Sequence, residues 1–266
     1  EQPVGDLAVG QALRQQVEDA SLLVGEVLEL LVLTGAVAQT LEHLGHPILW
    51  WEVPHRRVPD PGEEAVALPT GFTAPRAQVH FVSGEVQRLR QVLGDLAGHA
   101  LTDSDLHQSI RAANEIRALV NEIWALVARA TPCPLPALEM LLVDVLPVHF
   151  CSDREETRQV LEAILAEVRE RVAAGTGVVA NDAVGLYWVN PVADLRLMNL
   201  IEDCGACLRG ADFMFPHARA PVPADMAPVK ALAHVVLGDP MVGTAYDRAR
   251  RIAGERLELR PLHHIE

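Results

Sequence analysis

The chain has 266 residues, of which 50% are hydrophobic, 22% charged and 4% aromatic. It is long enough for one large domain or two modest ones. Its formal net charge of −14 comes from 36 acidic against 22 basic residues, which argues against nucleic-acid binding because phosphate contacts need clustered Lys and Arg. The apolar runs are too short to cross a membrane, no signal peptide opens the chain, and four cysteines do not resemble a secreted disulfide scaffold. These features predict a cytoplasmic protein.

The first part of the chain indicates helices followed by a strand. Apolar residues recur at helical spacing over residues 9–33, and a short helix over residues 36–45 should end at Gly45. The apolar run Ile48–Val53 lies between prolines and predicts a buried strand. Helix, glycine and strand form an α/β unit. Residues 54–75 are rich in Pro, Gly and charge and predict a loop.

The middle of the chain is predicted to be helical. One helix should end at Gly98, and "TDSD" at residues 102–105 should cap the next, which prolines end after residue 130. A third helix is expected over residues 135–150. A fourth follows, with Ser152 or Asp153 as its N-cap and Gly175 at its end.

The last third returns to α/β character. "GLYWVNP" at residues 185–191 predicts a strand, Asp194–Cys204 a helix, "LRGADFMF" at residues 208–215 a second strand, and two more helices follow to residue 257. The fold class is therefore α/β. The domains are a first lobe over residues 1–74, a helical linking segment over 75–176 and a second lobe over 177–266. We expect segments of the protein to be missing from this sequence, so either lobe can be incomplete.

The pair Cys204 and Cys207 forms a C-x-x-C at the end of a predicted helix. A zinc site would need a second ligand pair, and neither Cys133 nor Cys151 lies in one. A thioredoxin-like dithiol would lie at the start of a helix, where the dipole lowers the thiol pKa. The alternatives are one buried thiol that packs at a helix–turn–strand junction beside one incidental thiol, a redox or metal-binding pair, and a stand-alone zinc protein.

Other chemistry has little support in the sequence. A dinucleotide-binding glycine motif, a P-loop and a serine-nucleophile motif are all absent from it. His217 follows the second predicted strand of the last third, and α/β folds bind ligands at such strand ends. His217 is therefore a candidate for a substrate cleft.

Several stretches together resemble the benzoyl-CoA reductase / 2-hydroxyglutaryl-CoA dehydratase family, in particular its non-ATPase, iron–sulfur-carrying subunits. The resemblance is nearer to the benzoyl-CoA reductase branch and covers roughly residues 35–255. Ile110, Asn114 and Arg117 match a family pattern on one helix. The stretches that carry the resemblance are "FVSGEVQRLRQVLGDLAGHALTDSDLHQSIRAANEIRALVNEI", "YWVNPVADLRLMNLIEDCGA", "PVKALAHVVLGDPMVGTAYDRARRI" and "LEHLGHPILWWEVP".

The resemblance implies two flavodoxin-like lobes with parallel sheets, joined by a helical segment. It implies a heterodimer with a homologous second subunit, an ATP-dependent activator protein and an acyl-CoA substrate. It also implies one-electron reduction by a [4Fe-4S] cluster, as in benzoyl-CoA reductase-like or 2-hydroxyacyl-CoA dehydratase-like enzymes. Asn190 and Pro191 are candidates for lining the cleft, whereas Asn114 and Arg117 are interpreted as a pair that ties helix to lobe.

The cysteines depart from the family pattern. The turn "TGAVAQ" of the first lobe lacks a cysteine, and neither Cys204 nor Cys207 matches a ligand position of the family. Two hypotheses follow. The chain is an oxidoreductase or lyase subunit whose cluster ligands lie in missing segments, or it is a clusterless partner that stabilises a catalytic homologous subunit.

Overall fold

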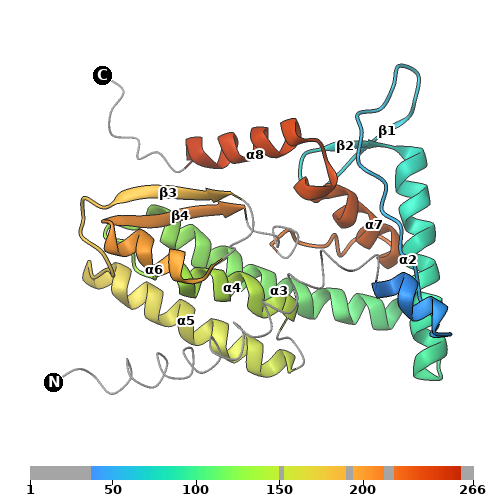
Figure 1. Cartoon of the computed structure of the whole chain (residues 1–266), viewed down its shortest axis with the longest axis horizontal. Helices are drawn as coiled ribbons and strands as arrows, with labels where there is room; N and C mark the ends of the chain where they lie inside the picture. The colour runs from blue at the N-terminus through green and yellow to red at the C-terminus, as the bar shows by residue number, and fades with distance from the viewer. Residues whose placement is uncertain (1–36, 150–152, 190–193, 213–218, 259–266) are drawn as a thin grey trace. The chain divides into compact units, whose positions relative to one another are not determined.

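The computed structural model describes residues 37–149, 153–189, 194–212 and 219–258 (Figure 1). The chain forms two units, residues 1–51 and 52–266, which are described separately below. The helix predicted over residues 9–33 lies outside the described residues. Among the helices that are described, none is both long and apolar enough to cross a bilayer.

In the first unit a helix runs over residues 37–43 and ends in a turn at Gly45. The positive φ of 87° at Gly45 favours glycine, and the Gly45 and His46 amides donate to the carbonyls of Glu42 and Leu41. This confirms the predicted helix end. The predicted strand over Ile48–Val53 is wrong: these residues have no strand hydrogen bonds, and Trp50 and Trp51 are exposed. An apolar run alone does not make a strand when no described strand pairs with it.

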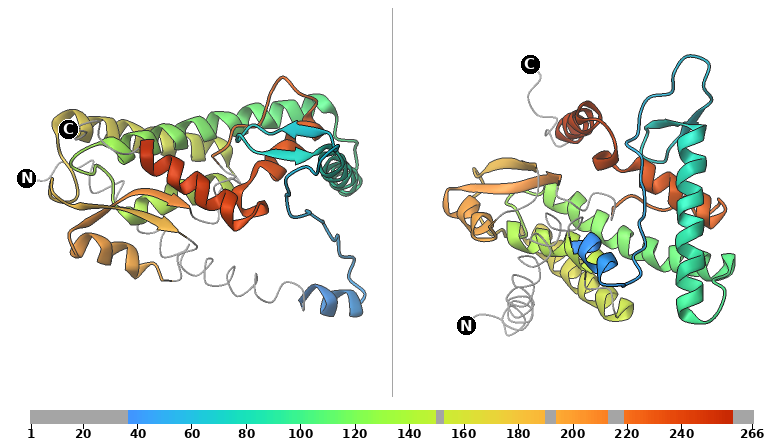
Figure 2. Two further views of the ribbon diagram at one scale, coloured as in Figure 1. Left: turned by 90° about the horizontal axis from the view of Figure 1, so that it is seen from above. Right: turned by 45° about the vertical axis from the view of Figure 1, so that its right-hand side comes forward.

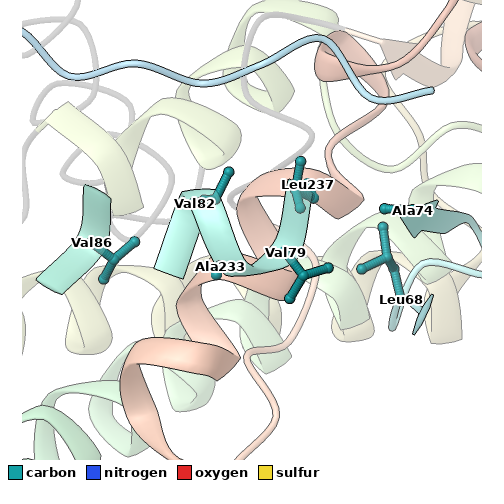
Figure 3. Packing of buried hydrophobic residues seen from close by; sticks show 7 residues of the cluster. All are labelled: Leu68, Ala74, Val79, Val82, Val86, Ala233 and Leu237. Carbon is teal, nitrogen blue, oxygen red and sulfur yellow. The ribbon is translucent and has the colours of Figure 1, made fainter. Parts of the chain in front are cut away.

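The second unit begins with a segment that ends in a β-hairpin, where the sequence had predicted only a loop. Strand β1 (Ala65–Ala67) pairs antiparallel with β2 (Thr73–Pro75). The hairpin packs on helix α2 (Arg76–Ala97) and on α7 (Pro228–Gly238), although some 130 residues separate these two helices in sequence. Figure 3 shows the shared core, formed by Leu68, Ala74, Val79, Val82, Val86, Ala233 and Leu237.

Helix α3 (Asp103–Arg129) is the longest described helix, and α4 (Ala137–His149) and α5 (Arg154–Ala174) pack against it. Its N-terminus carries the predicted cap, because Thr102 and Asp105 exchange hydrogen bonds in a capping box. Helix α5 is likewise capped by Asp153 at its N-terminus and by Gly175, whose φ is 63°, at its C-terminus. Trp124 of α3 donates a buried 2.7 Å hydrogen bond to Asp144 of α4, which joins the two helices.

Strands β3 (Val184–Val189) and β4 (Ala206–Asp212) run parallel, and helix α6 (Arg196–Asp203) connects them. Both strands and the helix between them were predicted, with β4 starting two residues earlier than expected. The strands lie side by side in Figures 1 and 2, and α6 contacts both β4 and α4. This is a β-α-β unit, the building block of α/β folds.

After β4 the chain returns to the hairpin through α7, continues as a single 3-10 turn, η2 (Pro240–Val242), and then forms α8 (Ala245–Glu258). The side chain of Arg56, 2% exposed, holds this junction together. It donates to the carbonyls of Leu237 at 2.5 Å and Asp239 at 3.1 Å, pairs with Asp247 at 3.3 Å and stacks 4.0 Å from the Phe72 ring.

The structure is mostly helical, with two small sheets among the described residues, one of them parallel. The α/β character is therefore present in the β-α-β unit. Two flavodoxin-like lobes, and the domain boundaries near residues 74 and 176, stay predictions.

Candidate functional site

The predicted cleft residues follow the two parallel strands. Asn190 and Pro191 come directly after β3, and His217 comes five residues after β4. All three lie outside the described residues. The structure does place both strands in parallel, so their carboxyl ends lie at the same sheet edge, where α/β folds bind ligands.

The structure separates the two cysteines of the C-x-x-C. Cys204 is exposed at the end of α6, and its amide donates to the Leu200 carbonyl. Cys207 is fully buried on β4, opposite Gly185 of β3. The described residues contain no group of three or more His, Cys, Asp or Glu side chains that could hold a metal ion. A metal held by Cys204 and Cys207 therefore gains no further ligand from this part of the chain.

Cys207 instead meets Cys133, a partner that lies 74 positions earlier and that sequence reasoning missed. Cys133 lies in the connection between α3 and α4, is 1% exposed, and its sulfur is 3.4 Å from the Leu135 carbonyl and 3.9 Å from the Leu208 carbonyl. Each thiol shifts the pKa of the other, and Leu208 follows directly after Cys207, so the two cysteines belong to one buried region. We call Cys133 and Cys207 the thiol pair. Nothing in the spacing of these residues indicates that they meet.

The charge around the thiol pair is asymmetric. The hydrogen bond from Cys133, aided by the nearby Arg209 guanidinium, outweighs burial and lowers the pKa of Cys207 to about 6. The same hydrogen bond and burial raise the pKa of Cys133 far above its usual value. Arg209 is fixed in place because it donates to the carbonyls of Val127 and Ala130 at the end of α3.

Glu202 lies close to the thiol pair on α6. Its carboxylate accepts a 2.7 Å hydrogen bond from the Ala137 amide at the start of α4, and burial raises its pKa. Its contact with the first turn of α4 shows that Glu202 ties two helices together.

The thiol pair does not fit an iron–sulfur cluster. A [4Fe-4S] cluster is usually held by four cysteine thiolates, each on a different corner. Cys133 and Cys207 are buried whereas Cys204 is exposed in a turn, and the described residues contain no group of three or more possible ligands. Of the four cysteines in the sequence, Cys151 lies outside the described residues. The described donors thus provide no ligand set for the cluster.

A pocket of about 360 Å³ lies where α3, α7 and α8 approach the segment that follows β4. Arg219 and Arg251 line it together with Asn121, Thr70 and Asp239. Arg219 stacks 5.1 Å from the Trp124 ring and donates to the Ala211 carbonyl, so its position is fixed. Its Nε atom is buried and has no hydrogen-bond partner within the described ranges. We call this the arginine pocket.

Asn114 and Arg117, the two polar residues that match the family pattern, lie on the same face of α3. Asn114 donates to the Val222 carbonyl at 2.8 Å and accepts from the Val222 amide at 2.9 Å, so it ties α3 to the segment after β4. Burial lowers the pKa of Arg117, and its Nε atom has no partner among the described residues. The structural role proposed for Asn114 agrees with these contacts.

Two comparisons with known proteins bear on this arrangement. The family model described as "2-hydroxyglutaryl-CoA dehydratase, D-component" matches residues 8–256. One of the subunits of the benzoyl-CoA reductase of Thauera aromatica is 30% identical over 145 residues, which cover 52% of this chain and 34% of that protein. The match thus spans about a third of the curated relative. Because the family model matches nearly the whole sequence, the chain belongs to the 2-hydroxyglutaryl-CoA dehydratase D-component family.

Proposed function

We propose that this chain is a subunit of an acyl-CoA-acting radical enzyme and supports a homologous subunit that carries the iron–sulfur cluster. Family membership supports the enzyme class. The observation that favours a supporting role is that the described residues contain no group of three or more His, Cys, Asp or Glu side chains that could hold a metal. An ATP-dependent activator would then deliver one electron to the homologous subunit.

The exposed apolar surface of β3 supports a docked homologous subunit. Parallel strands are usually covered on both faces, and their side chains are apolar for that reason. Here Val184 is 63% exposed and Val189 44%, and β3 has no second strand partner among the described residues. On α6, next to this sheet, Leu197 and Leu200 are exposed as well. The partner that we assign to this surface is a homologous, cysteine-bearing subunit.

Co-purification with iron analysis tests this function. We expect the chain alone to be colourless, and the chain co-expressed with a cysteine-bearing homologue to form a stoichiometric, brown complex. Val184→Asp combined with Val189→Asp should reduce the yield of the complex severalfold, because both charges would be buried at the interface. Val58→Asp, at an exposed site on the hairpin approach, is the matched control.

Two results would contradict the proposed function. If the chain alone, reconstituted without oxygen, binds about four iron and four sulfide ions, it carries the cluster itself and the supporting role is wrong. If no homologue co-purifies and the Val184 and Val189 variants behave like the Val58 variant, the docking surface is wrong.

The arginine pocket is our candidate contact for the anionic part of an acyl-CoA. Two guanidinium groups, Arg219 and Arg251, line it in a chain whose net charge is −14, and an amide, Asn121, lies beside them. Guanidinium groups bind phosphate oxygens through paired hydrogen bonds. The pocket volume of about 360 Å³ is at the lower end for ligand sites, so it suits a phosphate-bearing fragment rather than a whole acyl-CoA.

Substitution of the pocket arginines tests this contact. Arg251→Ala should weaken coenzyme A binding about tenfold, because a hydrogen bond to a charged group contributes about 1.5–3 kcal/mol. Arg219→Lys should weaken it less, since the charge stays but the paired geometry is lost. The matched control is Arg76→Ala, an exposed arginine on α2. Binding is measured by calorimetry, and equal affinities for all variants would rule the pocket out.

A further inference from the structure

Arg117 of α3 is a half-buried cation whose charge no group in the described part of the chain balances. Its Nε atom is buried and has no hydrogen-bond partner there. Burial is the one cause that lowers its pKa, so no described carboxylate acts on it. The internal ranges that the structure does not describe, residues 150–152, 190–193 and 213–218, contain no Asp or Glu. A buried charged donor without an acceptor is costly, and a bound anion is one of the groups that satisfy it.

Arg117 lies on the face of α3 that binds the segment after β4. Asn114, Asn121 and Trp124 share this face, because residues three, four or seven positions apart are neighbours on a helix surface. Asn114 binds the segment through both atoms of its amide group. Asn121 donates to the Arg219 carbonyl at 2.9 Å, and the Trp124 ring lies 5.1 Å from the Arg219 guanidinium. Of these four side chains, Arg117 is the one without a contact to the described segment.

The arginine pocket begins one helical turn further along this face. Asn121 and Arg219 both line it, whereas Arg117 lies just outside the lining residues. One turn spans about 5.4 Å, which the long side chain of arginine can bridge. Arg219 has a buried Nε atom without a partner in the described ranges, although its Nη2 atom donates to the Ala211 carbonyl at 3.1 Å. Two guanidinium groups with unused donors therefore lie along one seam, between α3 and the segment after β4.

We propose that Arg117 is a further binding residue of the arginine pocket, where it contacts a phosphate group of the ligand together with Arg219. This inference rests on the function proposed above for the pocket. A phosphate group supplies several acceptor oxygens and a negative charge, and guanidinium donors match its geometry. In the free protein the unpaired charge of Arg117 lowers stability, as binding groups often do, and the ligand offsets that loss.

Urea unfolding of the full chain is the first test. Arg117→Met removes the unpaired charge and keeps most of the side-chain length, so the unfolding midpoint of the free protein should shift to higher urea. Arg111→Met, at an exposed position of the same helix, is the matched control and should leave the midpoint unchanged. Coenzyme A should raise the midpoint of the wild-type protein more than that of the Arg117→Met variant.

Calorimetric titration with coenzyme A and with inorganic diphosphate is the second test. Arg117→Met should weaken the binding of both about tenfold, which corresponds to the loss of one hydrogen bond to a charged group. Arg117→Lys should weaken it less, because lysine keeps the charge and loses only the paired geometry. Arg111→Met should bind both compounds as the wild-type protein does.

The proposal is overturned if Arg117→Met shifts the midpoint of the free protein to lower urea, since Arg117 would then stabilise the fold. It is also overturned if Arg117→Met leaves both affinities unchanged, even where the variant binds a homologous subunit less well, because a protein carboxylate would then be the partner of Arg117.

The two proposals fail separately. If the Arg219 and Arg251 variants lose affinity for coenzyme A but Arg117→Met does not, the pocket binds its ligand without Arg117. If diphosphate binds in a manner that depends on Arg117 while coenzyme A does not bind, Arg117 is an anion-binding residue and the acyl-CoA contact is wrong.

Discussion

Replacement of Arg56 by Met is expected to lower the free energy of unfolding by about 3–5 kcal/mol, because removing one partner of a buried ion pair leaves the other charge uncompensated. Arg56 is 2% exposed and serves two carbonyls at the end of α7 as well as the Asp247 carboxylate of α8. Met fills most of the volume but donates no hydrogen bond. Urea unfolding followed by circular dichroism measures the change.

Arg57, the next residue, is the matched control for Arg56. Its guanidinium is 45% exposed and pairs with Glu63 at the surface. Arg57→Ala should change the unfolding midpoint little, because water and salt screen such pairs. If both variants unfold at the same urea concentration, Arg56 does not stabilise the junction of α7, η2 and α8. Should the Arg56 variant fail to fold, Asp247→Asn removes the same ion pair with almost no change of volume.

The ion pair between Arg56 and Asp247 should also make the stability of the protein depend on pH. Burial pushes the pKa of Asp247 upward, but hydrogen bonds from Thr244 and Arg56 outweigh it and hold this pKa below its usual value. A depressed pKa contributes stability that is full above the unfolded-state value of about 3.9 and is lost as the pH falls through the folded-state value. The wild-type protein should therefore lose more stability between neutral pH and acid than the Arg56→Met variant does.

Gly243→Ala is expected to destabilise the protein by about 1–3 kcal/mol, as insertion of a methyl group into a packed site does. Gly243 ends the "DPMVG" stretch, and its φ of −87° suits any residue, so the cost is steric. An added Cβ would collide with Nη2 of Arg56 and lie 2.8 Å from its Cζ and 3.0 Å from Asp247 Oδ2. A free arginine could move aside, but four interactions fix this one in place.

Gly254 is the control for Gly243, because its replacement by alanine is expected to raise rather than lower the free energy of unfolding. It lies within α8, and nothing lies within 4 Å of an added Cβ. Gly254→Ala should stabilise the protein by about 0.5–1 kcal/mol, because alanine is the better helix former. In the Arg56→Met background the cost of Gly243→Ala should fall, and the coupling measures the collision. If the effects of the two substitutions are additive, the methyl group of alanine at position 243 does not collide with Arg56.

Local signals predicted the helices and the β-α-β unit well. The caps at Thr102 and Asp153, the glycines at 98 and 175, and the strands on either side of α6 all lie within a few residues of the predicted positions. These signals are local because a cap or a left-handed glycine satisfies backbone groups only a few residues away. The strand expected over Ile48–Val53 failed because a strand depends on a partner that sequence spacing does not specify.

The family and the positions of most helices follow from the amino-acid order without the fold, because helix periodicity, caps and the family stretches are read along the chain. Which distant residues meet follows only from the folded chain: Cys207 meets Cys133 rather than Cys204, and Arg56 meets the carbonyls after α7. This difference arises because burial and hydrogen bonding act between neighbours in space. A sulfur or guanidinium acquires its chemistry from the groups that the fold brings to it.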